Sequence, residues 1–141
     1  MARFEINGID ALIDDLADLE NLPDELIADM LFAEAEIVGR EQSATGRAMG
    51  VVETGKTVES ITYEKKLKTT SSGKAVYVYP RGNRPNGKTT KRNAEVAFIN
   101  EYGKRGQPAR PFIRTANEKA SDEAIAAAEK VYNAYLDSKN L

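Results

Sequence analysis

The chain contains neither cysteine nor histidine among its 141 residues. Without cysteine, it can form neither a disulfide nor a thiolate metal site. Without histidine, it lacks the commonest general base, the commonest metal ligand and the side chain that usually changes charge near neutral pH. We therefore expect no catalytic residue, no metal site, no cofactor and no small-molecule substrate.

Long apolar runs are also missing from the sequence. No run approaches the ~20 residues that a membrane-spanning helix needs. The opening stretch MARFEINGID carries acids where a secretory signal needs an apolar segment. We therefore expect synthesis in the cytoplasm and no membrane partner. The length is ordinary for one domain covering residues 1–141, which can bury enough apolar surface for a core without cross-links.

The net charge of −2 conceals an uneven distribution along the chain. Residues 1–36 hold eleven acids and one base, whereas residues 37–115 hold sixteen bases and six acids. This polarity predicts one acidic and one basic face. The two faces can neutralise each other within a monomer, or copies can stack acidic face on basic face, as in a head-to-tail ring. Composition alone leaves both arrangements open.

Three parts of the chain carry apolar residues at helical spacing. The first, residues 8–20, follows Asn7 as a plausible N-cap and sets aspartates opposite the apolar residues Ile9, Leu12, Ile13, Leu16 and Leu19. The second is predicted from about Pro23 to Ser43, because proline suits a first helical position and acids follow it. The third runs from near Pro111 to about Ser138. Its apolar face comprises Phe112, Ala116, Ala120, Ala124, Ile125, Ala128, Val131, Tyr132, Tyr135 and Leu136.

The middle of the chain predicts shorter elements. Residues 43–57 contain three glycines and are expected to form a loop. Alternation between Ile61 and Leu67, and the β-branched stretch AVYVYP, predict two strands that pair as an antiparallel hairpin. The stretch AEVAFINEYG predicts a short helix that ends at Gly103. The expected fold class is therefore α+β, with a small antiparallel sheet packed against long helices.

The stretch RGNRPNGKTTKRN, residues 81–93, has five basic residues and no apolar one. We expect a mobile loop there, since it offers nothing to pack. Its bases can neutralise phosphates without reading sequence, although a solvent-exposed solubilising loop accounts for them equally well. No aromatic residue is interleaved with them to stack on bases. The candidate DNA-channel or polyanion contacts are Arg81, Arg84, Lys88, Lys91 and Arg92.

The same stretch matches the P-loop spacing through Gly82, Gly87, Lys88 and Thr89. That motif needs a buried strand before it and a helix directly after it. Here, an expected edge strand ending in Pro80 precedes it and the polar stretch TKRNAE follows it. We interpret the match as a coincidence, and no enzyme class is supported.

The stretch QPARPFIRTANEKA leads into the last helix. Pro108 and Pro111 stiffen an extended entry, and Pro111 also suits the start of the helix. Phe112 is expected to anchor that start in the core. Arg110 and Arg114 then remain to pair with acids, either of the same chain or of a neighbouring subunit.

Three stretches occur in a characteristic order: INGIDALIDDL, ETGKTVESITYE and AEVAFINEYGKRGQPARPFIRTANEKA. This order resembles the gene-product-ten-like tail-component family, small neck and tail proteins of long-tailed bacteriophages. The resemblance covers nearly the whole chain, and the basic insertion at 81–93 departs from it. Its most specific parts are Thr54-Gly55, Ser60-Ile61, Asn100-Glu101-Tyr102-Gly103 and Ala109-Arg110-Pro111-Phe112.

The resemblance implies a non-enzymatic structural virion protein, made in the host cytoplasm, that acts in head–tail joining or tail completion. Its partners would be copies of itself in a ring around the DNA channel, other neck or tail proteins, and DNA through non-specific contacts. An alternative hypothesis is a non-specific DNA-binding module acting through the basic stretch, although the sequence pI of about 5.3 disfavours it. The expected helix-entry clamp and subunit contact consists of Glu101, Tyr102, Gly103, Arg110, Pro111, Phe112 and Arg114.

Overall fold

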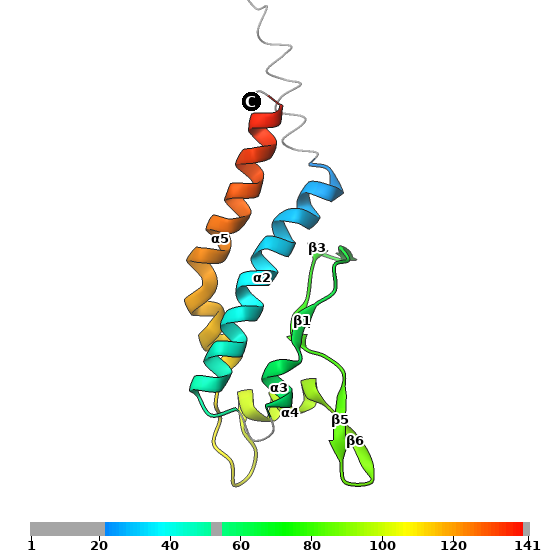
Figure 1. The fold of residues 1–141 in the computed structure, drawn as a ribbon, viewed down its shortest axis with the longest axis vertical. Coiled ribbons are helices and arrows are strands. Elements are labelled where there is room, and N and C mark those ends of the chain that lie inside the picture. The colour runs from blue at the N-terminus through cyan, green and yellow to red at the C-terminus, as the bar shows by residue number, and fades with distance from the viewer. Residues whose placement is uncertain (1–21, 52–54, 140–141) are drawn as a thin grey trace, which may run out of the picture.

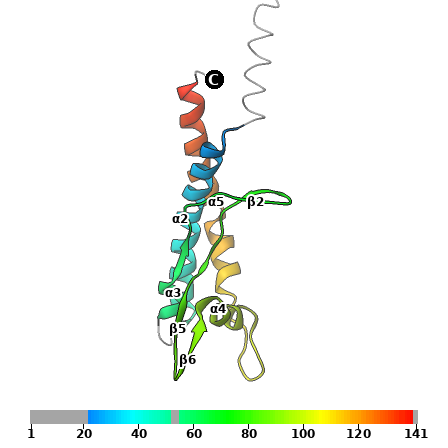
Figure 2. The same ribbon diagram turned by 90° about the vertical axis from the view of Figure 1, so that its right-hand side faces the viewer.

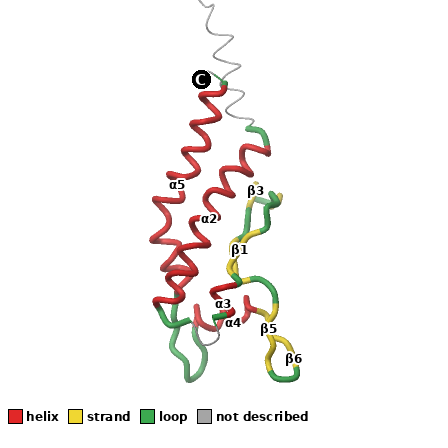
Figure 3. Tube along the Cα trace, in the orientation of Figure 1, coloured by secondary structure: helices red, strands yellow, loops and turns green. Residues whose placement is uncertain are grey.

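The protein is described here from a computed structural model, which places residues 22–51 and 55–139. The helix predicted over residues 8–20 lies outside these ranges. Within them, long helices combine with small antiparallel strand pairs, which confirms the predicted α+β fold class. The strands form three separate two-stranded ladders rather than one sheet, as the yellow segments of Figure 3 show.

Two long antiparallel helices, α2 (Asp24–Ala48) and α5 (Phe112–Ser138), form the body of the molecule (Figure 1). A buried row of alanines on α5 recurs every fourth residue and so lies on one face of the helix. These small side chains let the two backbones approach closely, as the alanine-rich sequence predicted. The row consists of Ala116, Ala120, Ala124 and Ala128.

Two details of these helices differ from the prediction. Helix α2 continues past Ser43 to Ala48, into the stretch expected to be a loop. Gly46 is tolerated there because it is buried and leaves room for Val58 and Phe112, so tertiary packing outweighs its low helix propensity. Ile125 was predicted on the core face of α5 but is 57% exposed, because it lies one residue beyond the alanine row.

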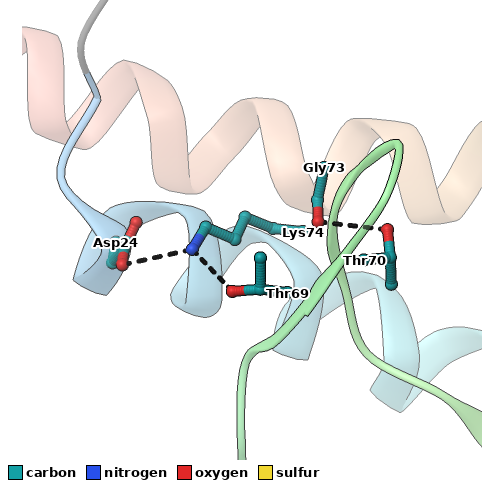
Figure 4. A network of polar contacts seen from close by, with 5 residues as sticks. All are labelled: Asp24, Thr69, Thr70, Gly73 and Lys74. Carbon is teal, nitrogen blue, oxygen red and sulfur yellow. Dashed lines mark hydrogen bonds and ion pairs between the residues drawn. The ribbon is translucent and has the colours of Figure 1, made fainter.

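An interrupted hairpin runs along α2. Strand β1 (Ile61–Tyr63) pairs with β4 (Val78–Pro80), and β2 (Lys68–Thr70) pairs with β3 (Gly73–Ala75), both antiparallel. The predicted hairpin is therefore confirmed. Its tip is fastened to the start of α2 by Lys74, whose Nζ lies 3.6 Å from Asp24 Oδ2 and donates to Thr69 Oγ1 at 2.9 Å (Figure 4).

A second hairpin corrects the expected loop at residues 81–93. Strand β5 (Asn83–Asn86) pairs antiparallel with β6 (Thr89–Arg92). The turn begins at Gly87, whose φ of 64° suits the primed two-residue turns of β-hairpins. The absence of apolar side chains misled the prediction, because a hairpin is held by backbone hydrogen bonds. This hairpin projects from the end of the molecule where α2 ends and α5 begins, which we call the base (Figures 1 and 2).

Two short helices complete the base. Helix α3 (Lys56–Glu59) lies within the stretch expected to be a loop, whereas α4 (Asn93–Tyr102) ends at Gly103 as predicted. Phe112 is fully buried, at 0% exposure, in a cluster with Val51, Val58 and Ala97. The core position expected for Phe112 is thus observed. Its neighbours come from α3, α4 and the segment after α2 rather than from the strands.

Glu34 on α2 provides a pH-dependent prediction. Burial raises the pKa of its carboxyl above the usual value, so the folded state disfavours the ionised form. This penalty is present above the raised pKa and disappears as the pH falls below the unfolded value. We expect Glu34→Gln to raise the midpoint of thermal unfolding at pH 7 and to lose that advantage in acid. Thermal melts of both proteins across this pH range test it, and an advantage that grows toward acid would contradict it.

Candidate functional site

Helix α4 and the connection from Gly103 to Pro111 separate two surfaces at the base. On one side, an open groove of about 860 Å³ lies between α4 and the first turns of α5; we call it the apolar groove. On the other side, a cleft of about 380 Å³ lies between α4 and hairpin β5–β6; we call it the basic cleft. The organisation of α4 and its connection therefore determines both candidate interaction surfaces.

The start of α5 is capped from α4 by Glu101. Pro111, the N-cap residue, has no side-chain oxygen with which to accept a hydrogen bond from the first turn. Instead, the backbone N–H of Ile113 donates to Glu101 Oε2 at 2.8 Å, and that of Arg114 donates to Oε1 at 3.0 Å. A carboxylate is also favoured at this position by the helix dipole. Glu101 thus holds the two helices that border the groove together.

The connection between the two helices folds back on the end of α4. Gly103 has φ 77° and ψ 176°, and a Cβ there would lie 2.9 Å from the backbone oxygen of Gln107 and the backbone nitrogen of Ala109. The next residues close a tight turn, in which the backbones of Lys104 and Gln107 exchange hydrogen bonds at 3.0 and 2.9 Å. The buried Asn100 then accepts the N–H of Arg110 on its backbone oxygen. A glycine is therefore required at the first step of this fold-back.

Removing the Glu101 carboxylate is expected to destabilise the entry to α5. Glu101→Ala leaves two helix N–H groups without their acceptor, which should lower the free energy of unfolding by about 1–2 kcal/mol. The matched control is Glu118→Ala, since Glu118 is exposed, lines the same groove and caps nothing. Amide hydrogen exchange should accelerate at Ile113 and Arg114 in the first variant alone. Equal effects of the two variants on stability and exchange would contradict the capping role.

The apolar groove is bordered by exposed aromatic rings. Phe98 and Tyr102 lie one turn apart on α4 with ring centroids 4.7 Å apart, and they are 63% and 70% exposed. Tyr79 of β4 contributes a third partly exposed ring. The wall of α5 adds Ile113 beside the proline that precedes the helix. The lining residues are Tyr79, Pro80, Ala94, Ala97, Phe98, Glu101, Tyr102, Ala109, Pro111, Ile113, Arg114, Asn117, Glu118 and Ser121.

The basic cleft collects cations from three segments. Arg84 of β5 and Lys91 of β6 are directly paired in the hairpin register and so share a face. Lys104 and Arg110 reach the same cleft from the α4–α5 connection. Among the described residues that line the cleft there is no acid. This arrangement favours an anion, such as a phosphate, without specifying a base.

The five basic residues singled out from the sequence do not act as one cluster. Only Arg84 and Lys91 line the basic cleft. Arg92 lies next to Lys91 along β6 and therefore points to the opposite face, and Lys88 is exposed in the turn. Arg81 contacts the other hairpin, where its guanidinium lies 3.7 Å from Glu64 Oε2 and 5.5 Å from the Tyr79 ring.

The residues of the expected helix-entry clamp have distinct positions in the structure. Glu101, Gly103 and Phe112 form the junction itself, whereas Tyr102 and Arg114 face the apolar groove. Arg110 was expected to pair with an acid, but its Nη1 donates to the backbone oxygen of Gly50 at 3.0 Å. That bond ties the connection to the end of α2. Within residues 22–51 and 55–139, no ion pair of Arg110 or Arg114 is formed.

Sequence reasoning missed the residues that join these surfaces to the fold. Lys104 was not selected although it lines the basic cleft, and neither was Phe98, the most exposed phenylalanine. For Phe98, a signal was available: it lies four residues before Tyr102, so both rings fall on one face of the predicted helix. Lys104 gives no such signal, because its position depends on the fold-back at Gly103.

The chain matches no protein-family model, no curated protein and no solved structure. Within the described part of the chain, no helix is long and apolar enough to cross a membrane. The same residues bring together no group of three or more acidic side chains able to hold a metal ion. The segment with P-loop spacing, from Gly82 to Thr89, folds as a β-hairpin instead of a loop that leads into a helix.

Proposed function

We propose that this chain is a non-enzymatic structural subunit of a tailed bacteriophage or prophage, acting in head–tail joining or tail completion. It assembles into a homo-oligomeric ring around the DNA channel and contacts other neck or tail proteins. The observation that carries the proposal is the apolar groove with its exposed aromatic pair. The resemblance of the motifs at Asn100–Gly103 and Ala109–Phe112 to the tail-component family supplies the kind of assembly.

The exposed rings support a role in protein contact. Soluble monomers rarely leave large contiguous apolar patches in water, and such patches commonly mark interaction sites. Phe98 and Tyr102 belong to the aromatic residues enriched at the centres of protein interfaces. Neither ring is needed to fill the core, because Phe112 and its neighbours occupy it. The groove therefore supports an interaction function better than a packing function.

The distribution of charge supports contacts between unlike ends of successive copies. Residues 22–36, at the start of α2, carry five acids and no base, whereas residues 81–110, at the base, carry eight bases and two acids. The long helices separate these two regions along the molecule (Figure 1). Opposite charges at opposite ends favour heterologous contacts, which close into a ring when the rotation between copies permits.

The proposal predicts that the protein associates with itself through the groove. The double variant Phe98→Asp/Tyr102→Asp should lose self-association, because two carboxylates cannot be buried without compensation. Its thermal unfolding should stay close to that of the unaltered protein, since both rings are exposed. Ile125→Asp serves as the control, because Ile125 is another exposed apolar residue but does not line the groove.

Light scattering and negative-stain imaging over a wide concentration range measure the outcome. The expected result is a concentration-dependent oligomer for the unaltered protein and Ile125→Asp, and a monomer for the double variant. An oligomer that survives the double substitution would show that the groove is not the contact.

A second candidate function, a non-specific DNA-binding module, is favoured by the basic cleft. It predicts binding to duplex DNA that weakens steeply as salt is raised. Neutralising Arg84 and Lys91 to glutamine should flatten the dependence of log K on log salt by about 0.9 per lost phosphate contact. Lys88→Gln is the control outside the cleft. Absence of binding to duplex DNA at low salt would reject this candidate.

A further inference from the structure

We propose that the apolar groove binds residues 8–20 of a neighbouring copy of this chain, as an amphipathic helix. The inference rests on the proposed function, because it names the contact by which copies join. It combines three observations: the groove at the base, the pattern of the N-terminal sequence, and the opposite charges of these two parts.

The N-terminal sequence has the pattern that the groove requires. Residues 8–20 set a stripe of five apolar side chains against a face of aspartates, as the spacing of Ile9, Leu12 and Leu16 shows. A helix this short is marginal by itself in water and needs a partner for its apolar face. Binding of such a helix in an apolar groove is a recurrent mode of recognition. Phe98, Tyr102 and Ile113 offer the complementary apolar surface.

The charges of the two parts are complementary. Residues 1–21 carry six acids and one base, and residues 81–110 carry eight bases and two acids. Within the groove, Arg114 stands against Glu101 and Glu118, and the Glu101 carboxylate already accepts two helix N–H groups. The positive charge beside the groove comes from Lys104 and Arg105, which are exposed directly after Tyr102 and Gly103. These cations suit the aspartate face of the bound helix.

The geometry favours a neighbouring copy over the same chain. Pro23 lies beside Ala134 near the end of α5, whereas the middle of the groove lies beside Asn117. At ~1.5 Å per residue, these two levels of α5 are roughly 25 Å apart. The four residues from Leu19 to Pro23 span at most roughly 14 Å. In helical form, Leu16 and Leu19 therefore stay outside the groove of their own chain, while a second copy can present the whole stripe.

Cysteine cross-linking tests the contact cleanly, because the chain has no cysteine of its own. One full-length chain carries Leu16→Cys and a second carries Phe98→Cys, and the two are mixed and oxidised. We expect a heterodimer linked between these positions, mapped by mass spectrometry. Replacing the second chain with Ile125→Cys is the control and should reduce the heterodimer roughly tenfold or more. Equal linking to both positions would overturn the inference.

A single chain that carries both Leu16→Cys and Phe98→Cys separates the two possible sources of the helix. Binding between copies gives linked multimers. A predominantly intramolecular product would overturn the inference, because it would place the chain's own segment in its groove.

A complementation experiment separates failure of this inference from failure of the proposed function. Leu12→Asp/Leu16→Asp removes the helix stripe, and Phe98→Asp/Tyr102→Asp removes the groove. Each variant alone should be monomeric, and the mixture should form dimers but nothing larger, since only one productive contact remains. Rings that persist in Leu12→Asp/Leu16→Asp would overturn the inference and leave the proposed function standing. Mixed dimers from an unaltered protein that never forms rings would support the contact and count against the ring.

Discussion

Replacing Phe112 with alanine is expected to lower the free energy of unfolding by about 3–5 kcal/mol. The ring is fully buried at the first residue of α5, where it contacts the cluster of Val51, Val58 and Ala97. Its truncation would leave a cavity between elements that meet only at the base, so the surroundings can close it only in part. Urea unfolding followed by circular dichroism measures the loss.

The matched control for this substitution is Phe98→Ala, which removes the same ring from a position 63% exposed. We expect its effect on stability to stay within about 0.5 kcal/mol, while its effect on self-association is the larger one. A loss below 1 kcal/mol for Phe112→Ala, together with abolished assembly, would contradict the core position and assign the ring to a partner.

The second large effect is expected at Gly103. Gly103→Ala places a Cβ 2.9 Å from two backbone atoms of the connection, in a φ,ψ region that is essentially reserved for glycine. Backbone strain and the forced displacement together should lower the free energy of unfolding by about 3 kcal/mol. Amide exchange at Ile113 and Arg114 should accelerate as well, because a displaced connection moves Glu101 away from the start of α5.

Gly106→Ala is the control for this prediction. Gly106 also has a positive φ, 81°, but a Cβ there would meet nothing within 4 Å. Only the strain remains, and we expect a loss of about 1–2 kcal/mol with unchanged exchange at Ile113. Equal losses for the two glycines would mean that the fold-back at Gly103 does not organise the junction.

The two long helices could be predicted because their apolar periodicity persists over many turns, where local exceptions matter little. The end of α4 at Gly103 also followed from sequence, since a glycine at a helix end has a specific conformational use. The extension of α2 through Gly46 did not follow, because it depends on Val58 and Phe112 packing on that glycine. Propensity carries no information about such a contact.

Hairpin β5–β6 was missed for a different reason. Its strands have no apolar alternation, which is the signal used to predict a strand. The pair Asn86-Gly87 was nevertheless a usable turn signal. With that turn in place, the register pairs Arg84 with Lys91 and separates both from Arg92, so the split among the basic residues would have followed.

The candidate site was predictable in its members but not in its organisation. Glu101, Gly103 and Phe112 were selected by resemblance to a family, with no physical function attached to the first two. The cap that Glu101 provides joins residues twelve and thirteen positions apart, across a connection whose path depends on Gly103. Such a path is set by tertiary structure, so sequence spacing alone gives no reason to expect it.

Deleting this gene from the phage or prophage that carries it tests the central claim most directly. Electron microscopy of the resulting particles should show DNA-filled heads and separate tails in normal numbers, with infectivity lost. The unaltered gene and Ile125→Asp should restore joined, infectious particles, whereas Phe98→Asp/Tyr102→Asp should not. A normal yield of joined, infectious particles from the deletion would contradict the proposed structural function.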